Sequence, residues 1–284
     1  MMAVALRALS AREYMDGAMT GGPVKLNTRI VDKPWGRRGI DPHFGVDESR
    51  QIGEIWFEPP GGRKLDVMAK YLFTTERLSI QVHPDNAAAE ARGHPRGKDE
   101  CWIILDADDD AEIGIGTVRE LSPSEVMEAA RNGSIVDLID WRKPKRGDFI
   151  YDPAGTIHAL GPGLTVLEIQ QAVDLTYRLF DYGRPRELHL AEAADVIEPR
   201  PHHHRLDTRV GEQSVLLVAG PYFGVAWCVG ESPVLPQAIR DVQLLPIDAP
   251  VGGVGPGECA LVDPKAARAL RSTGKFVLAW SLEN

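Results

Sequence analysis

Cysteines are few and lie far apart in the sequence. The 284-residue chain has three of them, Cys101, Cys228 and Cys259, and none belongs to a C-x-x-C pair. An odd and scattered set supports neither a disulfide framework nor a zinc site built on thiolates. We therefore expect the protein to work in a reducing compartment, the cytoplasm.

Long apolar runs and an excess of positive charge are also missing. No stretch approaches the roughly 18 apolar residues of a membrane-spanning helix, and Arg7 interrupts the short apolar run at the start, unlike a secretory signal. The 32 Lys and Arg against 41 Asp and Glu leave a net charge of −9, so no basic field exists to attract nucleic acid or an anionic membrane. We therefore expect neither nucleic acid nor a membrane as a partner.

Turn-forming residues are abundant, whereas aromatic residues are scarce. The 28 Gly, the 21 Pro and an aromatic content of 7% favour short strands joined by turns over a helical bundle. Alternating patterns predict strands at 24–31, 51–57 and 78–84. One helix is predicted at 122–133, because Ser122 and a Glu three residues later can form a capping box.

Composition divides the chain into three parts. Residues 1–22 are expected to form a poorly ordered or loosely packed extension. Residues 23–200 form the first β-rich domain, and a Pro- and His-rich break near 196–205 separates it from a second, smaller β domain at 201–284. Both domains are therefore expected to be mainly β.

One predicted strand carries a row of polar side chains. The period of two places Ser79, Gln81 and His83 on the same face of residues 78–83. Such a row is usually only the solvated side of a half-buried strand. The segment from Gly147 to His158 changes that interpretation, because it reads G-x5-P-x-G-x2-H and resembles the second motif of the cupin barrels, in which the histidine binds a metal.

Two departures from the first cupin motif point to one family. Gln81 replaces the first histidine, and the expected glutamate, Glu100, lies far beyond His83. With QVHPD at 81–85, GKDE at 97–100, PAGTIHA at 153–159 and Q-x-x-D-x-T-Y-R ending at Arg178, the chain resembles the type I phosphomannose isomerases (mannose-6-phosphate isomerases), in particular their short bacterial form. KPWG at 33–36 and IGEIW at 52–56 extend the resemblance.

The resemblance carries expectations about fold, cofactor and activity. It implies a cupin (jelly-roll β-barrel) catalytic domain with short helical inserts, followed by a smaller cupin-like domain. It implies one zinc ion per chain, and an isomerase that interconverts D-mannose 6-phosphate and D-fructose 6-phosphate through an enediol(ate). It also implies that Arg178 is catalytic. The zinc ligands that it implies are Gln81, His83, Glu100 and His158.

The chemistry of these residue types agrees with such a site. Zinc prefers nitrogen and oxygen donors in a tetrahedral arrangement, and a catalytic zinc keeps one position open. A single carboxylate with two neutral imidazoles and an amide leaves the site positively charged. A positive site suits the polarisation of a sugar carbonyl or an enediolate oxygen.

Isomerisation also needs a base and a cation beside the metal. Glu168 and Gln170 share one strand face, and Asp174 and Arg178 follow closely. We expect Arg178 to stabilise the enediolate or assist proton transfer, and Asp174 to serve as an acid or base in the same pocket. Glu168 is the preferred base, with zinc-bound hydroxide as the alternative.

A phosphorylated sugar requires local positive charge and hydrogen-bond donors. We expect Lys98 and Arg184 to contact the phosphate or hydroxyl groups, and Ser79 to add a hydroxyl hydrogen bond. Trp35 and Trp56 are candidates for lining the sugar pocket, although tryptophans in a barrel more often pack in the core. The two cations also lie beside turn glycines, where solvated charges are common.

Other patterns carry no site. The consecutive residues His202, His203 and His204 point to different sides of an extended segment, so they are expected on the surface of the boundary loop. Gly114 and Gly116 are interpreted as turn or bulge residues, because no helix follows them to bind a phosphate.

Three alternative functions remain at the level of sequence. One is an isomerase of another sugar phosphate, since the motifs define the metal better than the sugar pocket. A second is an Fe(II) dioxygenase on the same barrel, against which Gln81 and Arg178 argue. The third is a sugar-binding regulatory module that has lost turnover.

Overall fold

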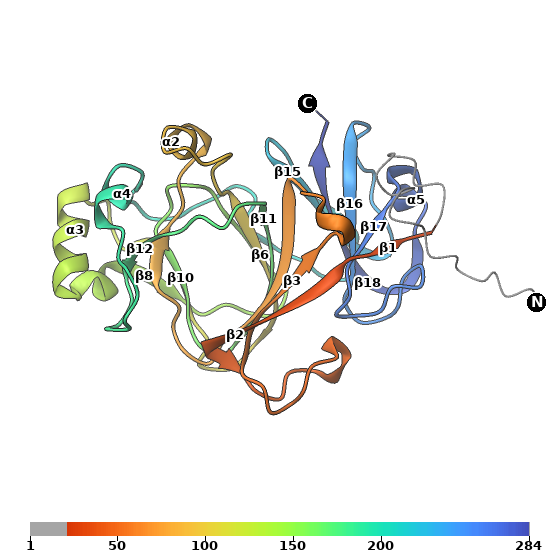
Figure 1. Cartoon of the computed structure of the whole chain (residues 1–284), viewed down its shortest axis with the longest axis horizontal. Coiled ribbons are helices and arrows are strands. Elements are labelled where there is room, and N and C mark those ends of the chain that lie inside the picture. The colour runs from red at the N-terminus through yellow and green to blue at the C-terminus, as the bar shows by residue number, and fades with distance from the viewer. Residues whose placement is uncertain (1–21, 284) are drawn as a thin grey trace, which may run out of the picture.

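The computed structural model describes residues 22–283, and it consists mainly of antiparallel β-strands in three sheets. The predicted extension at 1–22 lies outside the described residues except for Gly22. Figure 1 shows a barrel in the middle of the molecule, with helix α3 on one side and the C-terminal strands on the other. The predicted mainly β fold class is confirmed.

Two sheets form the barrel. The seven-stranded sheet has the order β13-β9-β6-β11-β4-β3-β2 and the five-stranded sheet the order β12-β5-β10-β7-β8. The seven strands are β2 (Asn27–Arg37), β3 (Ile52–Glu58), β4 (Val67–Phe73), β6 (Glu100–Ala107), β9 (Asp148–Asp152), β11 (Leu164–Gln171) and β13 (Thr208–Arg209). The five strands are β5 (Ile80–Val82), β7 (Ile113–Thr117), β8 (Ile139–Arg142), β10 (His158–Leu160) and β12 (Tyr177–Phe180).

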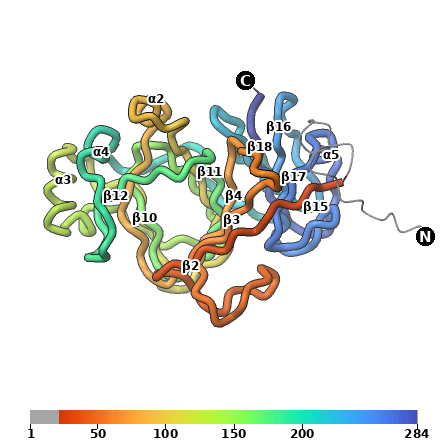
Figure 2. The backbone as a smooth tube through the Cα atoms, viewed as in Figure 1, coloured from red at the N-terminus to blue at the C-terminus, as the bar shows by residue number. Residues whose placement is uncertain are grey.

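The third sheet has six strands and comes largely from the C-terminal part of the chain. Its order is β1-β17-β16-β18-β15-β14. Figure 2 shows the first described strand, β1, lying beside these C-terminal strands. The strands are β1 (Val24–Lys25), β14 (Val215–Ala219), β15 (Phe223–Glu231), β16 (Ile239–Pro246), β17 (Ala260–Val262) and β18 (Arg271–Leu282). The boundary between 23–200 and 201–284 stays a prediction, and β1 and β13 show that each part lends a short strand to the other's sheet.

Short helices cover the outer side of the barrel and the far end of the molecule. They are α2 (Asn86–Glu90), α3 (Pro123–Asn132), α4 (Leu190–Ala194) and α5 (Pro264–Arg268), with 3-10 turns at Pro42–Phe44, Pro60–Gly62 and Ser134–Leu138. The predicted helix is confirmed as α3, where Ser122 and Glu125 form the capping box and Gly133 ends the helix in a left-handed conformation. No helix in the described part of the chain is long and apolar enough to cross a membrane.

The alternation along β11 explains how the layers are built. Leu167 and Ile169 point outward and share a core with residues of the C-terminal sheet such as Val225. Val166 points into the barrel, where it packs in a second apolar cluster. Because the outer face of the seven-stranded sheet is covered, its inner face can carry polar side chains along the same strands, and Glu168 is one of them.

The segment after α4 is held against the barrel, which corrects one prediction. His202 is buried and its Nε2 lies 3.0 Å from Asp207 Oδ2, so its expected place on the surface is wrong. His203 is exposed, and His204 stacks on Tyr151 at 4.7 Å. Packing of the preceding residues against strand β7 pulls His202 inward, a tertiary effect that the local sequence does not reveal.

Gly116 allows the segment after α4 to pack against the barrel. It pairs with Pro201, it has a φ of +71°, and a Cβ at its position would come within 2.4 Å of the His202 backbone nitrogen. The pairing of β7 with β8 shifts its register between Gly114 and Thr117, so the interpretation of Gly114 and Gly116 as bulge residues is confirmed.

Substitution of this glycine tests the attachment. Gly61 is a matched control, because its φ is +75° but nothing lies within 4 Å of its Cβ position. Gly61→Ala should cost about 1 kcal/mol of unfolding free energy from the left-handed backbone alone. Gly116→Ala should cost about 1–3 kcal/mol more, because the backbone of His202 must shift. Urea unfolding of both variants measures the difference, and equal losses would contradict the role of Gly116.

Candidate active site

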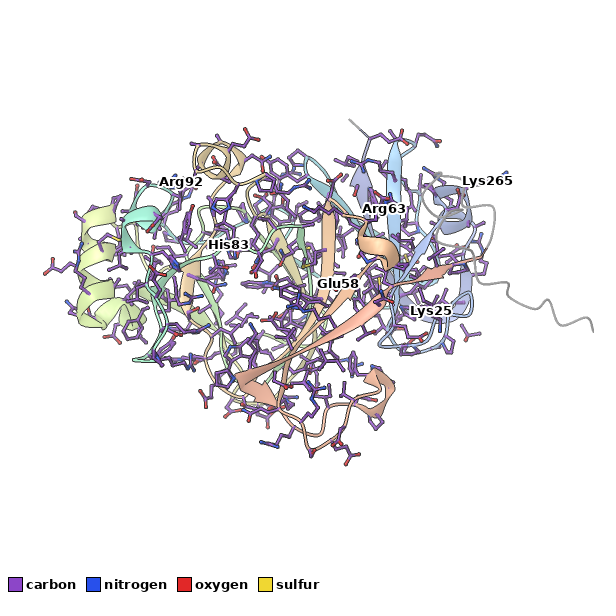
Figure 3. All side chains as sticks on the ribbon, in the orientation of Figure 1. Lys25, Glu58, Arg63, His83, Arg92 and Lys265 are labelled. Atoms are coloured by element: carbon purple, nitrogen blue, oxygen red, sulfur yellow. The ribbon has the colours of Figure 1, made fainter. Side chains whose placement is uncertain are left out.

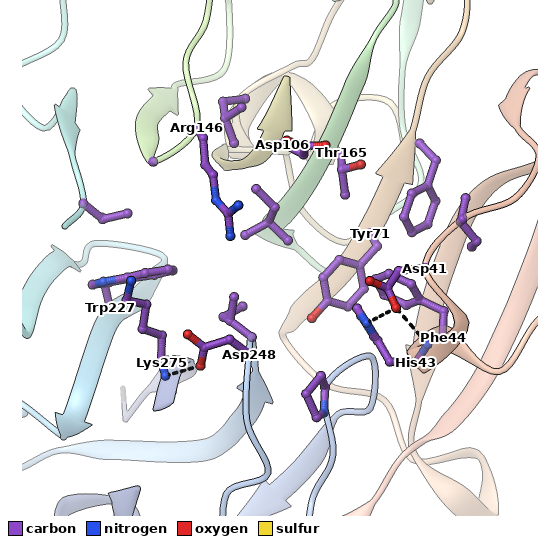
Figure 4. Close-up of a pocket in the computed structure, with 18 of the residues that line it drawn as sticks. Asp41, His43, Phe44, Tyr71, Asp106, Arg146, Thr165, Trp227, Asp248 and Lys275 are labelled. Atoms are coloured by element: carbon purple, nitrogen blue, oxygen red, sulfur yellow. Dashed lines mark hydrogen bonds and ion pairs between the residues drawn. The ribbon is translucent and has the colours of Figure 1, made fainter. Parts of the chain in front are cut away.

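The predicted site residues share one cleft and are absent from another, larger one. A cleft of about 940 Å³ lies between the barrel and the C-terminal sheet, and Figure 4 shows Tyr71, Arg146, Trp227 and Lys275 around it. None of the predicted catalytic, substrate-binding or metal-binding residues lines it. The second cleft, of about 220 Å³, enters the barrel and is lined by ten of them. These ten are Trp35, Trp56, Ser79, Gln81, Lys98, Glu100, His158, Glu168, Asp174 and Arg178.

Three buried side chains meet at the floor of the barrel cleft. The ligand-type atoms of His83, Glu100 and His158 lie within 4.8 Å of one another. Glu100 begins β6 of one sheet, while His158 begins β10 of the other and pairs directly with Gln81 of β5. In Figure 3, His83 lies in the barrel half of the molecule, away from the C-terminal strands. The cluster therefore joins the two walls of the barrel.

Both histidines present the same nitrogen to this cluster. His83 Nδ1 donates to the carbonyl oxygen of Leu175 at 2.8 Å, and His158 Nδ1 donates to that of Thr156 at 3.1 Å. In the neutral form of each ring the lone pair is therefore on Nε2, and the two Nε2 atoms lie 3.5 and 3.6 Å from the two oxygens of Glu100. Metal-binding histidines are commonly oriented by such hydrogen bonds from the other ring nitrogen.

Lys98 places a cation among these donors. Its ammonium group donates to His83 Nε2 at 3.0 Å and to Glu100 Oε2, and it lies 3.4 Å from Glu168 Oε1. A positive group thus already occupies the neighbourhood of the donor atoms. The chemistry of the two imidazoles and the carboxylate fits a divalent cation at the same place.

Gln81 fits as a fourth ligand by its amide. Its Nε2 lies 3.1 Å from His158 Nε2, and its Oε1 accepts from Ser79 Oγ at 3.1 Å. Rotation of the amide by half a turn would direct the oxygen to the cluster and the nitrogen to the Ser79 hydroxyl, which can also accept a hydrogen bond. The predicted ligand set is therefore brought together in one place.

Burial and neighbouring charges tune these groups in opposite directions. Burial, with Lys98 next in effect, lowers the pKa of His83 to about 3, so this imidazole is neutral. Burial alone would raise the pKa of Glu100, but Lys98 and His83 hold it well below its ordinary value. Burial and the nearby Glu100 charge raise the pKa of Glu168, against the influence of two lysines. The cleft thus holds one firmly ionised carboxylate and one that binds a proton more readily.

Arg178 is positioned by β12, where it pairs with Gln81 of β5. Its Nη1 donates to the carbonyl oxygen of Glu187 at 2.7 Å, and its buried Nε has no hydrogen-bond partner. Burial and Arg186 lower the pKa of Arg178. No ion pair joins Arg178 to a carboxylate in the described part of the chain, so its positive charge is available to an anionic substrate.

Arg184 is not brought into the cleft, which corrects its predicted role. Its guanidinium donates to the carboxylates of Glu76 and Asp181 and to the carbonyl oxygen of Arg77. Arg186, two residues later, lines the cleft instead. Trp35 lines the cleft, but it is almost completely buried in the apolar cluster inside the barrel, so it forms part of the cleft wall. Trp56 lines the same cleft.

Lys70 is a cleft residue that the sequence analysis missed. Its Nζ lies 3.0 Å from Glu168 Oε1, across the pairing of β4 with β11. Burial would lower its pKa, but Glu168 and Glu54 raise it, so it stays charged. The signal was present in the alternation of 67–73, where a lysine falls on the face opposite Val67, Ala69 and Tyr71. Its acidic partners could not be read from one strand.

Comparisons of sequence and of structure with known proteins point to one family. No protein-family model matches the chain. The mannose-6-phosphate isomerase of Streptococcus mutans serotype c is 32% identical over 258 residues, which covers 76% of this chain and 81% of that protein. The mannose-6-phosphate isomerase ManA of Bacillus subtilis is 34% identical over 214 residues, which covers 68% of this chain and 67% of that protein.

The solved structures confirm the cupin fold. The crystal structure of a Bacillus subtilis mannose 6-phosphate isomerase superposes with a TM-score of 0.73 at 27% identity, over 91% of this chain and 99% of that one. A variant of the phosphomannose isomerase from Salmonella typhimurium shares the fold, with a TM-score of 0.66 at 13% identity, over 93% of this chain. Together with the curated relatives, these results show that the chain belongs to the mannose-6-phosphate isomerase family of enzymes.

Proposed function

We propose that the protein is a zinc-dependent aldose–ketose isomerase that interconverts D-mannose 6-phosphate and D-fructose 6-phosphate. The observation that carries the proposal is one cleft in which the His83, Glu100 and His158 cluster lies beside a carboxylate of raised pKa, Glu168, and an unpaired guanidinium, Arg178. The mannose-6-phosphate isomerases among the relatives support the choice of sugar phosphate.

The metal would be held by Gln81, His83, Glu100 and His158. When bound, zinc supplies Lewis acidity towards the carbonyl and enediolate oxygens of the sugar. The single carboxylate in this ligand set keeps the charge of the site positive. Aldose–ketose isomerisation further requires removal of a proton beside the carbonyl and its return to the neighbouring carbon.

Glu168 is the proton carrier in this proposal. Its carboxylate is buried, and burial with the Glu100 charge makes it a stronger base than an exposed glutamate. Lys70, 3.0 Å away, and Lys98, 3.4 Å away, keep it ionised before it accepts the proton. Their ammonium groups can also donate hydrogen bonds to substrate oxygens in the water-poor interior of the barrel.

Arg178 stabilises negative charge that develops on the substrate. Its guanidinium has a buried Nε that is free to donate, and a substrate oxyanion would complete it. Asp174, exposed at the cleft, helps to keep Arg178 charged against the opposing influence of Arg186. Arg186 and Ser79 line the same cleft and are assigned to the phosphate and hydroxyl groups, in place of Arg184.

The other functions considered from the sequence find less support. Family membership argues against the Fe(II) dioxygenase and against a regulatory module without turnover. Another sugar phosphate as substrate remains the relevant competitor, because the cluster defines enolisation chemistry better than sugar identity.

A coupled assay tests the proposed reaction. The purified protein should convert mannose 6-phosphate to fructose 6-phosphate, lose this activity in a chelator and regain it on addition of zinc. The same assay should be run with other aldose phosphates, including glucose 6-phosphate and ribose 5-phosphate. Turnover of another aldose phosphate without turnover of mannose 6-phosphate would reject the assignment.

Removal of the free guanidinium tests the role of Arg178. Arg178→Ala should lower kcat by about 100-fold or more while zinc content stays unchanged, because a donor to the transition state is lost. Arg184→Ala is the matched control, since its guanidinium lies outside the cleft. Full activity of Arg178→Ala, or a large rise of KM in Arg184→Ala, would contradict the placement of the two arginines.

The pH dependence of kcat tests the role of Glu168. Its raised pKa means that activity is present at higher pH and is lost as the pH falls and the carboxylate takes up a proton. Lys70 opposes that rise, so Lys70→Met should move the acidic limb of the kcat profile to higher pH. An unchanged or lower limb in an active Lys70→Met enzyme would count against Glu168 as the base.

A further inference from the structure

A buried carboxylate that the proposed reaction does not use lies behind one of the presumed ligands. Asp152 ends strand β9, and its side chain is 1% exposed. It pairs directly with Glu100 across β6 and β9. Two acidic side chains therefore lie opposite each other on the inner wall of the barrel, an arrangement that is unfavourable without a compensating positive charge.

Asp152 lies against the His158 imidazole, on the side of its Nδ1. Asp152 Oδ2 lies 2.7 Å from His158 Nδ1, closer than the Thr156 carbonyl oxygen at 3.1 Å. Neither oxygen of Asp152 accepts a well-aligned hydrogen bond from any group in residues 22–283. Burial raises the pKa of Asp152, and His158 is the strongest opposing influence. Within residues 22–283 the ion pair of this carboxylate is with a presumed metal ligand.

A purely structural acid would be bonded differently. Asp207, in the same region, accepts hydrogen bonds from the backbone of Tyr151 at 3.0 Å and from His202 at 3.0 Å. Asp99 likewise accepts from the Tyr151 hydroxyl and from a backbone nitrogen. Asp152 has no such bonds to the fold, so burying it there is costly for the barrel.

We propose that Asp152 is a positioning residue for metal binding, which holds the His158 ring and strengthens its donation of electrons to a divalent ion. The Thr156 carbonyl oxygen already selects the tautomer, so the contribution of Asp152 is its negative charge behind the ring. A carboxylate in this position makes a ligating imidazole more basic. The proposal rests on the proposed function only in that the cluster binds a metal.

Two substitutions of Asp152 test this role in the metal-loaded protein. Asp152→Asn is isosteric, and Asp152→Val offers a β-branched side chain that suits the apolar barrel interior should the amide disturb folding. Both remove the charge. In both, the dissociation constant for zinc, measured by competition with a chromophoric chelator, should rise about 10–100-fold. The midpoint of thermal unfolding of the metal-free protein should stay the same or rise, because a buried charge is lost.

The absorption spectrum of the cobalt(II)-substituted protein provides a second test of the effect of Asp152 on the bond between His158 and the metal. Its d–d bands should shift in the Asp152 variants, since the donor strength of His158 changes while the ligand set does not. Asp207→Asn is the matched control, because its Asp–His pair does not contact a presumed ligand, and its affinity and spectrum should equal those of the unaltered protein. His158→Ala shows how far zinc affinity falls when the ligand itself is removed.

Unchanged zinc affinity and an unchanged cobalt spectrum in a folded Asp152 variant would overturn the proposal. An equal loss of affinity in Asp207→Asn would overturn it as well, since the effect would then come from the packing of β9. These measurements do not use the sugar phosphate. A failure of the mannose 6-phosphate assay in the unaltered protein would therefore reject the reaction and leave the role of Asp152 to be decided by metal binding.

Discussion

The compensation of buried charge at the floor of the barrel is the constraint on which the rest of the site depends. Glu100 and Lys98 are almost fully buried, and their charged groups contact each other. A buried carboxylate is tolerated only when cations or hydrogen-bond donors surround it. Here the donors are the Lys98 ammonium group and the Trp102 indole, whose Nε1 lies 3.1 Å from Glu100 Oε1. The same need selects the kind of ion that the cluster can take, because a divalent cation can be bound by the carboxylate and both imidazoles together.

The fold meets this constraint by separating two environments across one sheet. The outer face of the seven-stranded sheet packs against the C-terminal sheet in a continuous apolar core. That contact stabilises the strands, so their inner face can expose Lys70, Glu100 and Glu168 to the cleft. The five-stranded sheet supplies Gln81, His158 and Arg178 from neighbouring strands. Side chains from two sheets thus converge in one cleft.

Much of this site is predictable from the sequence because it follows local rules. The period of two in the strand at 78–83 places Ser79, Gln81 and His83 on one face by backbone geometry. The ligand roles of Glu100 and His158 followed from the resemblance to the phosphomannose isomerases. The capping box of α3 is equally local, and it was predicted correctly. Ten of the twelve predicted site residues line the cleft, and His83 belongs to its buried cluster.

The residues that were missed or misplaced depend on contacts between distant segments. Arg184 and Arg186 follow the same turn and both pair with Asp181. Arg184 also pairs with Glu76, whereas Arg186 lines the cleft. Lys70 can be recognised as a cleft residue only when the strand pairing that places Glu168 opposite it is known. His202 is buried because Gly116 has no Cβ and therefore leaves room for the His202 backbone beside it. The hydrophobic periodicity of a single segment cannot predict these contacts between distant segments.

The location of a bound metal tests the account most directly. Anomalous X-ray diffraction at the zinc edge, from crystals of the protein grown with zinc, locates the ion independently of any assay. The account predicts one zinc per chain, bonded to Nε2 of His83, to Nε2 of His158 and to the carboxylate of Glu100, with the Gln81 amide oxygen turned towards it. A zinc ion bound elsewhere in the chain, with this cluster still held together by Lys98, would contradict it.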